Sequence, residues 1–264
     1  MMERHFCLDD GPGFKMIELE CIDSTNNFLK TFRPIQPCDM TLVTAEFQSK
    51  GRGQADHSWE SEKGLNLLFS LKVHPRFLEA GKMFRISEIT ALAVYAALAH
   101  YTEDISIKWP NDIYWKDKKI CGRLIENDWM GKQLEQSIIG VGININQPVF
   151  TSDAPNPVSL KQIIGKETER RFVLELFMEH FTRYYKMLQQ DEEDTIDTLY
   201  KQMLYRKKGW HTYEDDNGRF QAKLYDVRPD GHLILEDDKG DKRTYAFKEV
   251  RFILCTPDNK EFCL

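Results

Sequence analysis

The pattern of apolar residues changes near Lys208, and this change constrains the fold more than any single motif does. Before Lys208, extended apolar segments alternate with longer segments whose apolar residues recur at helical spacing. After it, short alternating segments are separated by turn residues, a pattern typical of a small all-β unit. The sequence therefore predicts an α+β domain over residues 1–207, in which helices pack on a β-sheet, and a β module over residues 208–264.

The expected strands of the larger domain are short and apolar: 16–20, 41–47, 65–73, 105–109, 112–115, 119–127 and 136–146. The expected helices are amphipathic or rich in alanine and leucine: 23–32, 83–101, 168–189 and 192–204. The β module has expected strands at 220–227, 232–238, 242–247 and 250–254. Because a unit of about fifty residues buries little apolar surface, we expect it to dock on the larger domain.

The composition disfavours several classes of protein. The 42 acidic residues exceed the 36 Lys and Arg residues, giving a net charge of −6, whereas neutralising nucleic-acid phosphates needs a basic excess. No run of eighteen apolar residues and no secretory signal are present, so we expect a cytoplasmic protein with no membrane partner. The 6 cysteines form no C-x-x-C pair, which favours reduced thiols over disulfides or a structural metal.

Two glycines flank an arginine in the segment GRGQADHSW, residues 51–59. A loop of this kind can hold a phosphate, because glycine lets backbone N–H groups approach closely and the guanidinium of Arg52 donates in a planar fork. Most G-x-G segments are only turns, so the motif alone leaves both interpretations open. Gly140 and Gly142 lie within an expected strand. Glycines at such positions mark either a β-bulge or the close approach of a ligand, and the sequence favours neither alternative.

Five motifs occur in one order: STN at 24–26, FQSKGRGQADHSW at 47–59, KWPNDI at 108–113, KICGRLIE at 119–126 and GVGIN at 140–144. In this order and spacing they resemble the motifs of the biotin protein ligases, and the resemblance covers nearly the whole chain. It implies a mixed β-sheet packed with helices, in the class II synthetase-like fold, over residues 1–207. It also implies an SH3-like β-barrel over residues 208–264.

The resemblance further implies a two-step reaction that consumes ATP. The biotin carboxylate attacks the α-phosphate of ATP, with Mg²⁺ carried by the nucleotide, and gives biotinyl-5′-adenylate and pyrophosphate. A lysine of the biotin carboxyl carrier protein of a carboxylase then takes the biotinyl group.

The resemblance also implies roles for individual residues. The residues implied for catalysis are Lys119, Arg52 and Asp112. The residues implied for biotin binding are Ser24, Thr25, Gln48, Gly51, Arg52, Trp59, Lys119, Gly122, Gly140 and Gly142. The residues implied for nucleotide binding are Arg52, Gly53, Gln54, His57, Trp59, Lys119 and Asn144, and Asn144 is also the one possible protein ligand of Mg²⁺.

The chemistry of these residue types fits their implied roles but leaves alternatives. Bringing a carboxylate against a polyphosphate requires cations, which Arg52 and Lys119 supply. Asp112 either polarises the acceptor amine or only forms a turn. Ser24 either contacts biotin or caps the following helix, or does both. Trp59 either covers the biotin tail or packs in the core.

The glycine loop departs from the family pattern G-R-G-R-x-G-R-x-W. Gln54, Asp56 and His57 stand where the family has an arginine, a glycine and a basic residue. Because the loop carries fewer cations, we expect weaker retention of the adenylate.

Two other functions stay open, a lipoate-protein ligase of the same fold and a non-catalytic biotin-binding module. A DNA-binding repressor is not expected, because only about fifteen residues precede the first expected strand and the charge balance is acidic. The sequence fixes neither the acceptor protein nor whether the chain is a monomer or a homodimer.

Overall fold

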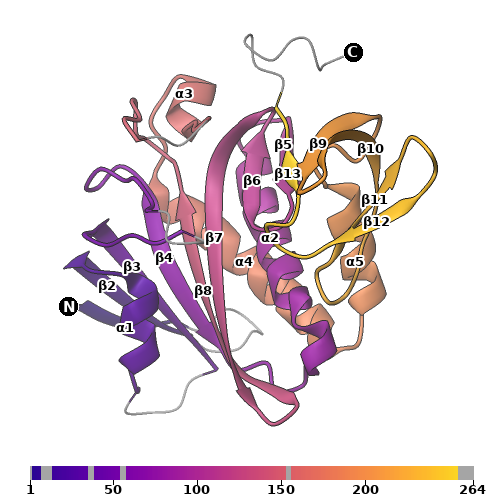
Figure 1. Cartoon of the computed structure of the whole chain (residues 1–264). Helices are drawn as coiled ribbons and strands as arrows, with labels where there is room; N and C mark the ends of the chain where they lie inside the picture. The colour runs from indigo at the N-terminus through magenta and orange to yellow at the C-terminus, as the bar shows by residue number, and fades with distance from the viewer. Residues whose placement is uncertain (1, 7–13, 35–38, 54–57, 153–155, 255–264) are drawn as a thin grey trace.

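The computed structural model describes residues 2–6, 14–34, 39–53, 58–152 and 156–254. Within these ranges, a large sheet has eight strands in the order β1-β2-β3-β4-β8-β7-β6-β5 (Figure 1). Its strands are β1 (Met2–Phe6), β2 (Phe14–Ile22), β3 (Met40–Gln48), β4 (Leu67–Val73), β5 (Ile105–Lys108), β6 (Asp112–Trp115), β7 (Lys118–Met130) and β8 (Gln133–Ile143). The β2–β3 pair is parallel and the other pairs are antiparallel, so the sheet is mixed, as expected.

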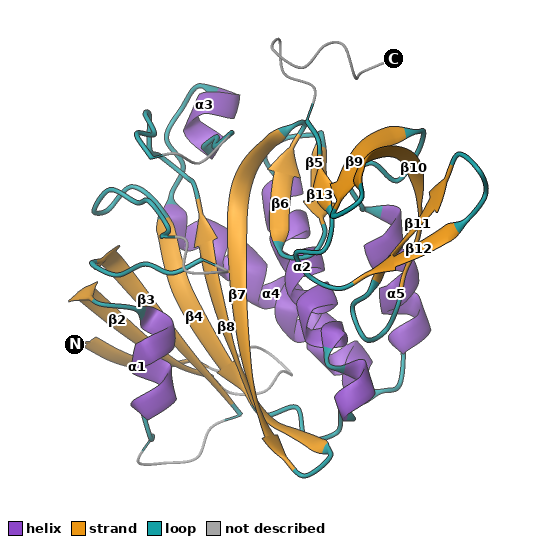
Figure 2. Cartoon of the chain, viewed as in Figure 1, coloured by secondary structure: helices purple, strands orange, loops and turns teal. Residues whose placement is uncertain are grey.

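Helices cover both faces of this sheet (Figure 2). On one face, α1 (Thr25–Thr31) contacts β3, β4 and β8. On the other face, α2 (Phe84–Ala99) packs against α4 (Arg170–Gln189) and α5 (Glu193–Gln202). The sequence predicted these four helices. It did not predict β1 or the short helix α3 (Leu160–Ile164).

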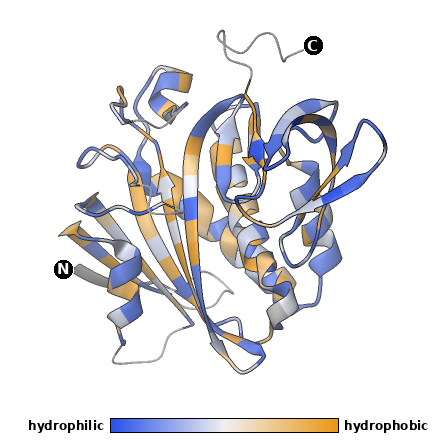
Figure 3. Ribbon diagram, in the orientation of Figure 1, coloured by the Kyte–Doolittle hydropathy of each residue, from blue (hydrophilic) through white to orange (hydrophobic). Residues whose placement is uncertain are grey.

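The alternation of side chains along the strands produces two apolar layers. Ile17, Val43 and Ile138 pack with Leu29 of α1 in a small cluster, whereas their neighbours along the strands join the larger core under α2 and α4. All residues of β4 are buried, because this central strand has helices on both sides. Hydrophobic residues accordingly concentrate in the central strands and the covering helices (Figure 3). In the part of the chain that the structure describes, no helix is long and apolar enough to cross a bilayer.

A second sheet follows the helices, and in the described residues all its neighbouring strands are antiparallel. In spatial order, its strands are β12 (Lys242–Tyr245), β11 (Leu233–Asp237), β10 (Gly218–Val227), β9 (His211–Asp215) and β13 (Arg251–Phe252). This arrangement is consistent with the expected SH3-like unit, to which the structure adds β9. The division into domains 1–207 and 208–264 stays a prediction.

The second sheet docks on the first through aromatic residues. The indole nitrogen of Trp109, in the turn between β5 and β6, donates to the carbonyl of Gly231 at 2.9 Å. The ring of Phe247 lies 5.5 Å from the ring of Trp109 and 6.0 Å from that of Phe84 on α2. An ion pair of 2.6 Å between Lys201 and Asp226 joins α5 to β10. The expected docking of the β module is thus observed.

Candidate active site

Glycines lie side by side on the face of the sheet that carries α1. Gly142 of β8 lies opposite Gly122 of β7, and Gly140 lies opposite Leu124. Asp112 of β6 continues the first row beyond Gly122. Positions without a side chain leave a trough in the sheet. This trough is the floor of a cavity of about 760 Å³, a volume typical of small-molecule sites.

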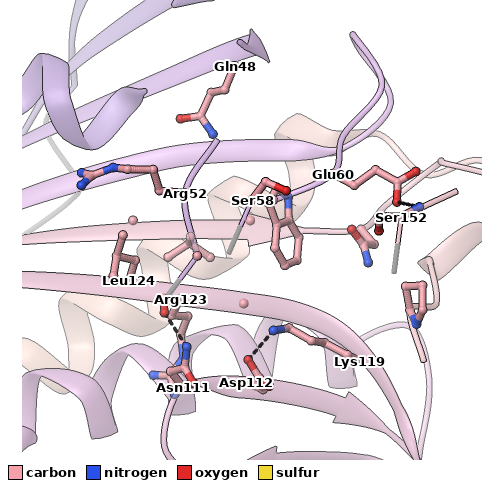
Figure 4. A pocket seen from close by; sticks show the side chains of 18 of the residues that line it. Gln48, Arg52, Ser58, Glu60, Asn111, Asp112, Lys119, Arg123, Leu124 and Ser152 are labelled. Atoms are coloured by element: carbon pink, nitrogen blue, oxygen red, sulfur yellow. Dashed lines mark hydrogen bonds and ion pairs between the residues drawn. The ribbon is translucent and has the colours of Figure 1, made fainter. Parts of the chain in front are cut away.

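The cavity brings most of the predicted site residues together (Figure 4). The predicted residues that line it are Ser24, Thr25, Gln48, Arg52, Gly53, Trp59, Asp112, Lys119, Gly122, Gly140, Gly142 and Asn144. Gly51 is not among the lining residues, and an added Cβ there would be 3.0 Å from the carbonyl oxygen of Trp59. Gln54 and His57, as well as the departure at Asp56, lie outside the described residues.

The start of α1 forms one polar wall of the cavity. Both the backbone N–H and the hydroxyl of Thr25 donate to Oε1 of Gln48, at 2.8 and 2.9 Å. Ser70 of β4 connects the same wall to the floor, with its hydroxyl 2.6 Å from Thr25 Oγ1 and 2.5 Å from Asn26 Oδ1. Ser24 occupies the N-cap position of α1, but its side chain makes no capping hydrogen bond. Ser24 lines the cavity, and its predicted contact with biotin stays a prediction.

Lys119 lies near the start of β7 and points into the cavity rather than forming part of a solvated turn. Its Nζ is 2.7 Å from Oδ1 of the buried Asp112 and 5.7 Å from the centre of the Trp59 ring. The backbone fixes this position, because the N–H of Lys119 donates to Asn156 and its carbonyl accepts from Val158. A cation and a carboxylate are thus held together at the edge of the glycine floor.

Trp59 occupies the space that the glycines leave. A Cβ added at Gly122 would lie 2.7 Å from the Trp59 ring, and one added at Gly142 would lie 2.6 Å from it. At Gly140 the colliding group would be the amide of Asn26. Glycine is therefore required at these positions by the packing of the tryptophan and the asparagine. The indole nitrogen of Trp59 is buried, and no described residue accepts a hydrogen bond from it.

Arg52 extends away from Lys119 and Asp112 in this structure (Figure 4). Its Nη2 lies 3.0 Å from Oε2 of Glu126, which also accepts from Asn26 at 2.8 Å, while Oε1 accepts from Lys30 at 2.7 Å. Burial alone would raise the pKa of Glu126, but these hydrogen bonds and charges outweigh it and lower the pKa. Glu126 is therefore an ionised partner for Arg52.

Several lining or supporting residues were not predicted. Asn26 and Glu126 belong to the STN and KICGRLIE motifs, so the motifs themselves were the available signal. Glu60 follows Trp59, and its carboxylate accepts from the backbone N–H groups of Thr151 and Ser152 at 2.8 and 2.9 Å. This contact joins the glycine loop to a distant loop, so no local pattern indicates it.

Asn144 is the lining residue best suited to contact a metal ion. Its Nδ2 donates to the carbonyl of Val158 at 3.2 Å, and its buried Oδ1 has no hydrogen-bond partner among the described residues. Within those residues, no cluster of three or more His, Cys, Asp or Glu side chains could hold a metal. The site therefore fits Mg²⁺ that arrives on phosphate oxygens and takes a single protein oxygen, rather than a dedicated protein cage.

The mixed sheet packed with helices and the second antiparallel sheet match the fold of the biotin protein ligases. Residues 18–144 match the Biotin/lipoate A/B protein ligase family. This match spans slightly less than half of the chain. Together with the likeness to named biotin protein ligases, it identifies the chain as an enzyme with a domain similar to those of this family.

Named relatives support this assignment. The chain is 28% identical over 240 residues to the "Bifunctional ligase/repressor BirA" of Bacillus spizizenii, a match that covers 89% of the chain and 73% of the relative. It is 28% identical over 155 residues to the "Biotin--[acetyl-CoA-carboxylase] ligase" of Paracoccus denitrificans, covering 55% of the chain and 63% of that protein.

A solved structure extends the likeness to the fold. The biotin protein ligase from Aquifex aeolicus, in complex with biotin and ATP, is 25% identical to the chain. It superposes with a TM-score of 0.75 and covers 90% of the chain and 99% of its own length. The expected mixed sheet with helices is confirmed.

Proposed function

We propose that the chain activates biotin with ATP as biotinyl-5′-adenylate and transfers the biotinyl group to a lysine of a biotin carboxyl carrier protein of a carboxylase. The proposal is supported by the names of the Paracoccus and Aquifex proteins and by the biotin and ATP bound in the Aquifex structure. The observation that carries it is the pair of Lys119 and Asp112 beside Trp59 on the glycine floor.

In the first step, an oxygen of the biotin carboxylate forms a bond to the α-phosphorus of ATP, and pyrophosphate leaves with the electron pair of the broken P–O bond. Both reactants are anions, so fixed cations must offset their repulsion. Lys119 supplies one when its ammonium turns from Asp112 toward the reacting oxygens. Arg52 supplies the other by exchanging Glu126 for the biotin carboxylate, which it can bind through two hydrogen bonds.

Magnesium belongs to this step as an ion bound to the ATP phosphates, where it would offset their charge. Asn144 would contribute its free Oδ1, the oxygen that finds no partner among the described residues. The three floor glycines, Gly122, Gly140 and Gly142, would hold the biotin rings and tail together with Trp59. Thr25 and Gln48 would form hydrogen bonds to the ureido group.

In the second step, the acceptor amine attacks the biotinyl carbonyl and AMP leaves. The amine must be unprotonated, so a group that accepts its proton or orients it raises the rate. Asp112 is buried at the edge of the cavity and suits this role once Lys119 has moved to the phosphate.

Biotin-dependent exchange of labelled pyrophosphate into ATP tests the first step, and labelling of a carboxylase biotin carrier domain tests the second. We expect both with biotin and neither with lipoate. Exchange driven by lipoate alone would identify a lipoate ligase instead. Tight biotin binding with no exchange would identify a non-catalytic binding module.

A further inference from the structure

Lys108 is a half-buried lysine that the proposed reaction leaves without a role. It is the last residue of β5 and lies directly opposite Asp112 of β6. The side chain is 18% exposed, and its Nζ is 3.8 Å from Oδ2 of Asp112. It is not among the residues that line the cavity.

The second sheet contributes to the surroundings of this lysine. The Nζ of Lys108 lies 5.1 Å from the ring centre of Tyr114 and 5.2 Å from that of Phe252, which belongs to β13. Burial lowers the pKa of Lys108, the nearby Asp112 opposes this, and the charges of Lys119 and Arg206 lower it further. The two rings favour the ammonium in a place where water is scarce.

Asp112 is therefore held between two cations that differ in access. Lys119 contacts Oδ1 and lines the cavity, so an incoming phosphate can take it. Lys108 faces Oδ2 from outside the cavity lining, where an incoming phosphate does not reach it. If Lys119 left and no other cation remained, Asp112 would be an unpaired buried carboxylate, which is strongly unfavourable.

We propose that Lys108 is a positioning residue for adenylation: it remains beside Asp112 when Lys119 moves to the ATP phosphate, and Phe252 of the second sheet holds it in place. The proposal rests on the proposed function. It implies that Lys108 acts through Asp112, by making Lys119 easier to release, and that it touches neither substrate.

A double-mutant cycle on biotin-dependent pyrophosphate exchange tests this coupling. We expect Lys108→Met to slow exchange about tenfold or more, because Asp112 then holds Lys119 more strongly. Lys108→Arg, which keeps the charge, should restore most of the rate. In an Asp112→Asn background, Lys108→Met should cause less than about a twofold further loss, since no carboxylate is left to compensate.

Lys116→Met is the matched control, because Lys116 also lies over an aromatic ring, the indole of Trp115, and near a carboxylate, that of Asp104 at 3.7 Å. It is on the surface and should leave exchange unchanged. Phe252→Leu should lower the rate alone but add nothing to Lys108→Met. An equal loss from Lys108→Met in both backgrounds would mean that Lys108 only supports the fold, and would overturn the proposal.

The same four proteins of the cycle, unfolded in urea, give a readout that does not depend on activity. We expect Lys108→Met and Asp112→Asn to have non-additive effects on the free energy of unfolding. If the parent protein shows no biotin-dependent exchange, the proposed function fails. Additive effects in urea would separately overturn the inference about Lys108.

Discussion

At the scale of single residues, the site depends on charges that have protein partners before any substrate binds. Lys119 is paired with Asp112 and Arg52 with Glu126, each through a short ion pair. Exchanging one partner of such a pair for another costs less free energy than keeping a desolvated cation without any partner. The cations are therefore held near the cavity without being left unpaired.

Replacing Lys119 by alanine should lower the adenylation rate by about 10²–10³, as expected when one preorganised group that stabilises developing charge is removed. Pyrophosphate exchange measures this step alone. Lys118→Ala is the control, because Lys118 is the exposed neighbour and is not among the lining residues. Near-normal exchange by a folded Lys119→Ala protein would contradict the assigned role.

Adding one methyl group at Gly142 should weaken biotin binding about tenfold or more, because the new Cβ would lie 2.6 Å from the Trp59 ring and push it from its place. Calorimetric titration with biotin gives the affinity. Gly81→Ala provides the control, since no described atom lies within 4 Å of a Cβ there. Equal affinities of the two variants would show that Trp59 moves aside without cost.

At the scale of elements, the sequence predicts segments whose own composition decides their structure. The strand β4 and the helix α2 are mostly apolar and were both predicted. The helix α3 was missed because five residues are too few for a helical period, even though Ser159 and Gln162 form a capping box. The strand β1 was missed as well, and among the described strands its one neighbour is β2, at the edge of the sheet.

Most of the site residues that lie within the five motifs were predicted from the sequence. The contacts within the site were not, because they join residues far apart in the chain. Asn26 and Glu126, for example, are 100 positions apart and meet at 2.8 Å. Such pairs depend on strand order and register, which no local pattern specifies.

A buried charge network between α2 and α5 should make stability depend on pH. Burial raises the pKa of Glu88 to about 7, although Arg85 lies 2.6 Å away. The folded form therefore keeps a proton that the unfolded form loses near pH 4.5. Glu88 thus contributes stability below about pH 4.5, and this contribution declines by up to about 1.4 kcal/mol per pH unit as the pH rises to about 7.

The variant Glu88→Gln should remove this dependence. We expect its free energy of unfolding in urea to change less than that of the parent protein between pH 5 and pH 7. Glu175→Gln is the control, because Glu175 is exposed on α4 and pairs with Arg171 at the surface. Parallel pH profiles for the parent and Glu88→Gln proteins would show that Glu88 is ionised throughout this range.

At the scale of the whole molecule, the two sheets are joined by contacts that neither could satisfy alone. The backbone carbonyl of Gly231 is bonded by Trp109, and a Cβ at Gly231 would lie 2.8 Å from the Phe84 ring. The ring of Phe252, in the second sheet, lies 5.2 Å from Nζ of Lys108 in the first. We therefore expect the sheets to unfold together rather than one by one.

Trp109→Phe should lower the stability of the whole chain by roughly 1–3 kcal/mol, since it leaves the Gly231 carbonyl without its buried donor. Scanning calorimetry should show one transition at a lower temperature. Trp129→Phe, in a residue that is 40% exposed at the far end of β7, should have little effect. Two separate transitions in the parent protein would contradict the joint unfolding of the sheets.

The position of Trp59 has a practical consequence. Its indole lies inside the cavity over Gly122 and Gly142, whereas the indoles of Trp129 and Trp210 are exposed at the surface. The wavelength and intensity of tryptophan fluorescence depend on the groups immediately around the indole ring. We therefore expect a substrate that enters the cavity to change the fluorescence of Trp59 and to leave that of the surface tryptophans unchanged. The fluorescence of Trp59 should thus report whether the cavity holds a ligand. Rapid mixing could follow the arrival of biotin, then of ATP, without any added label.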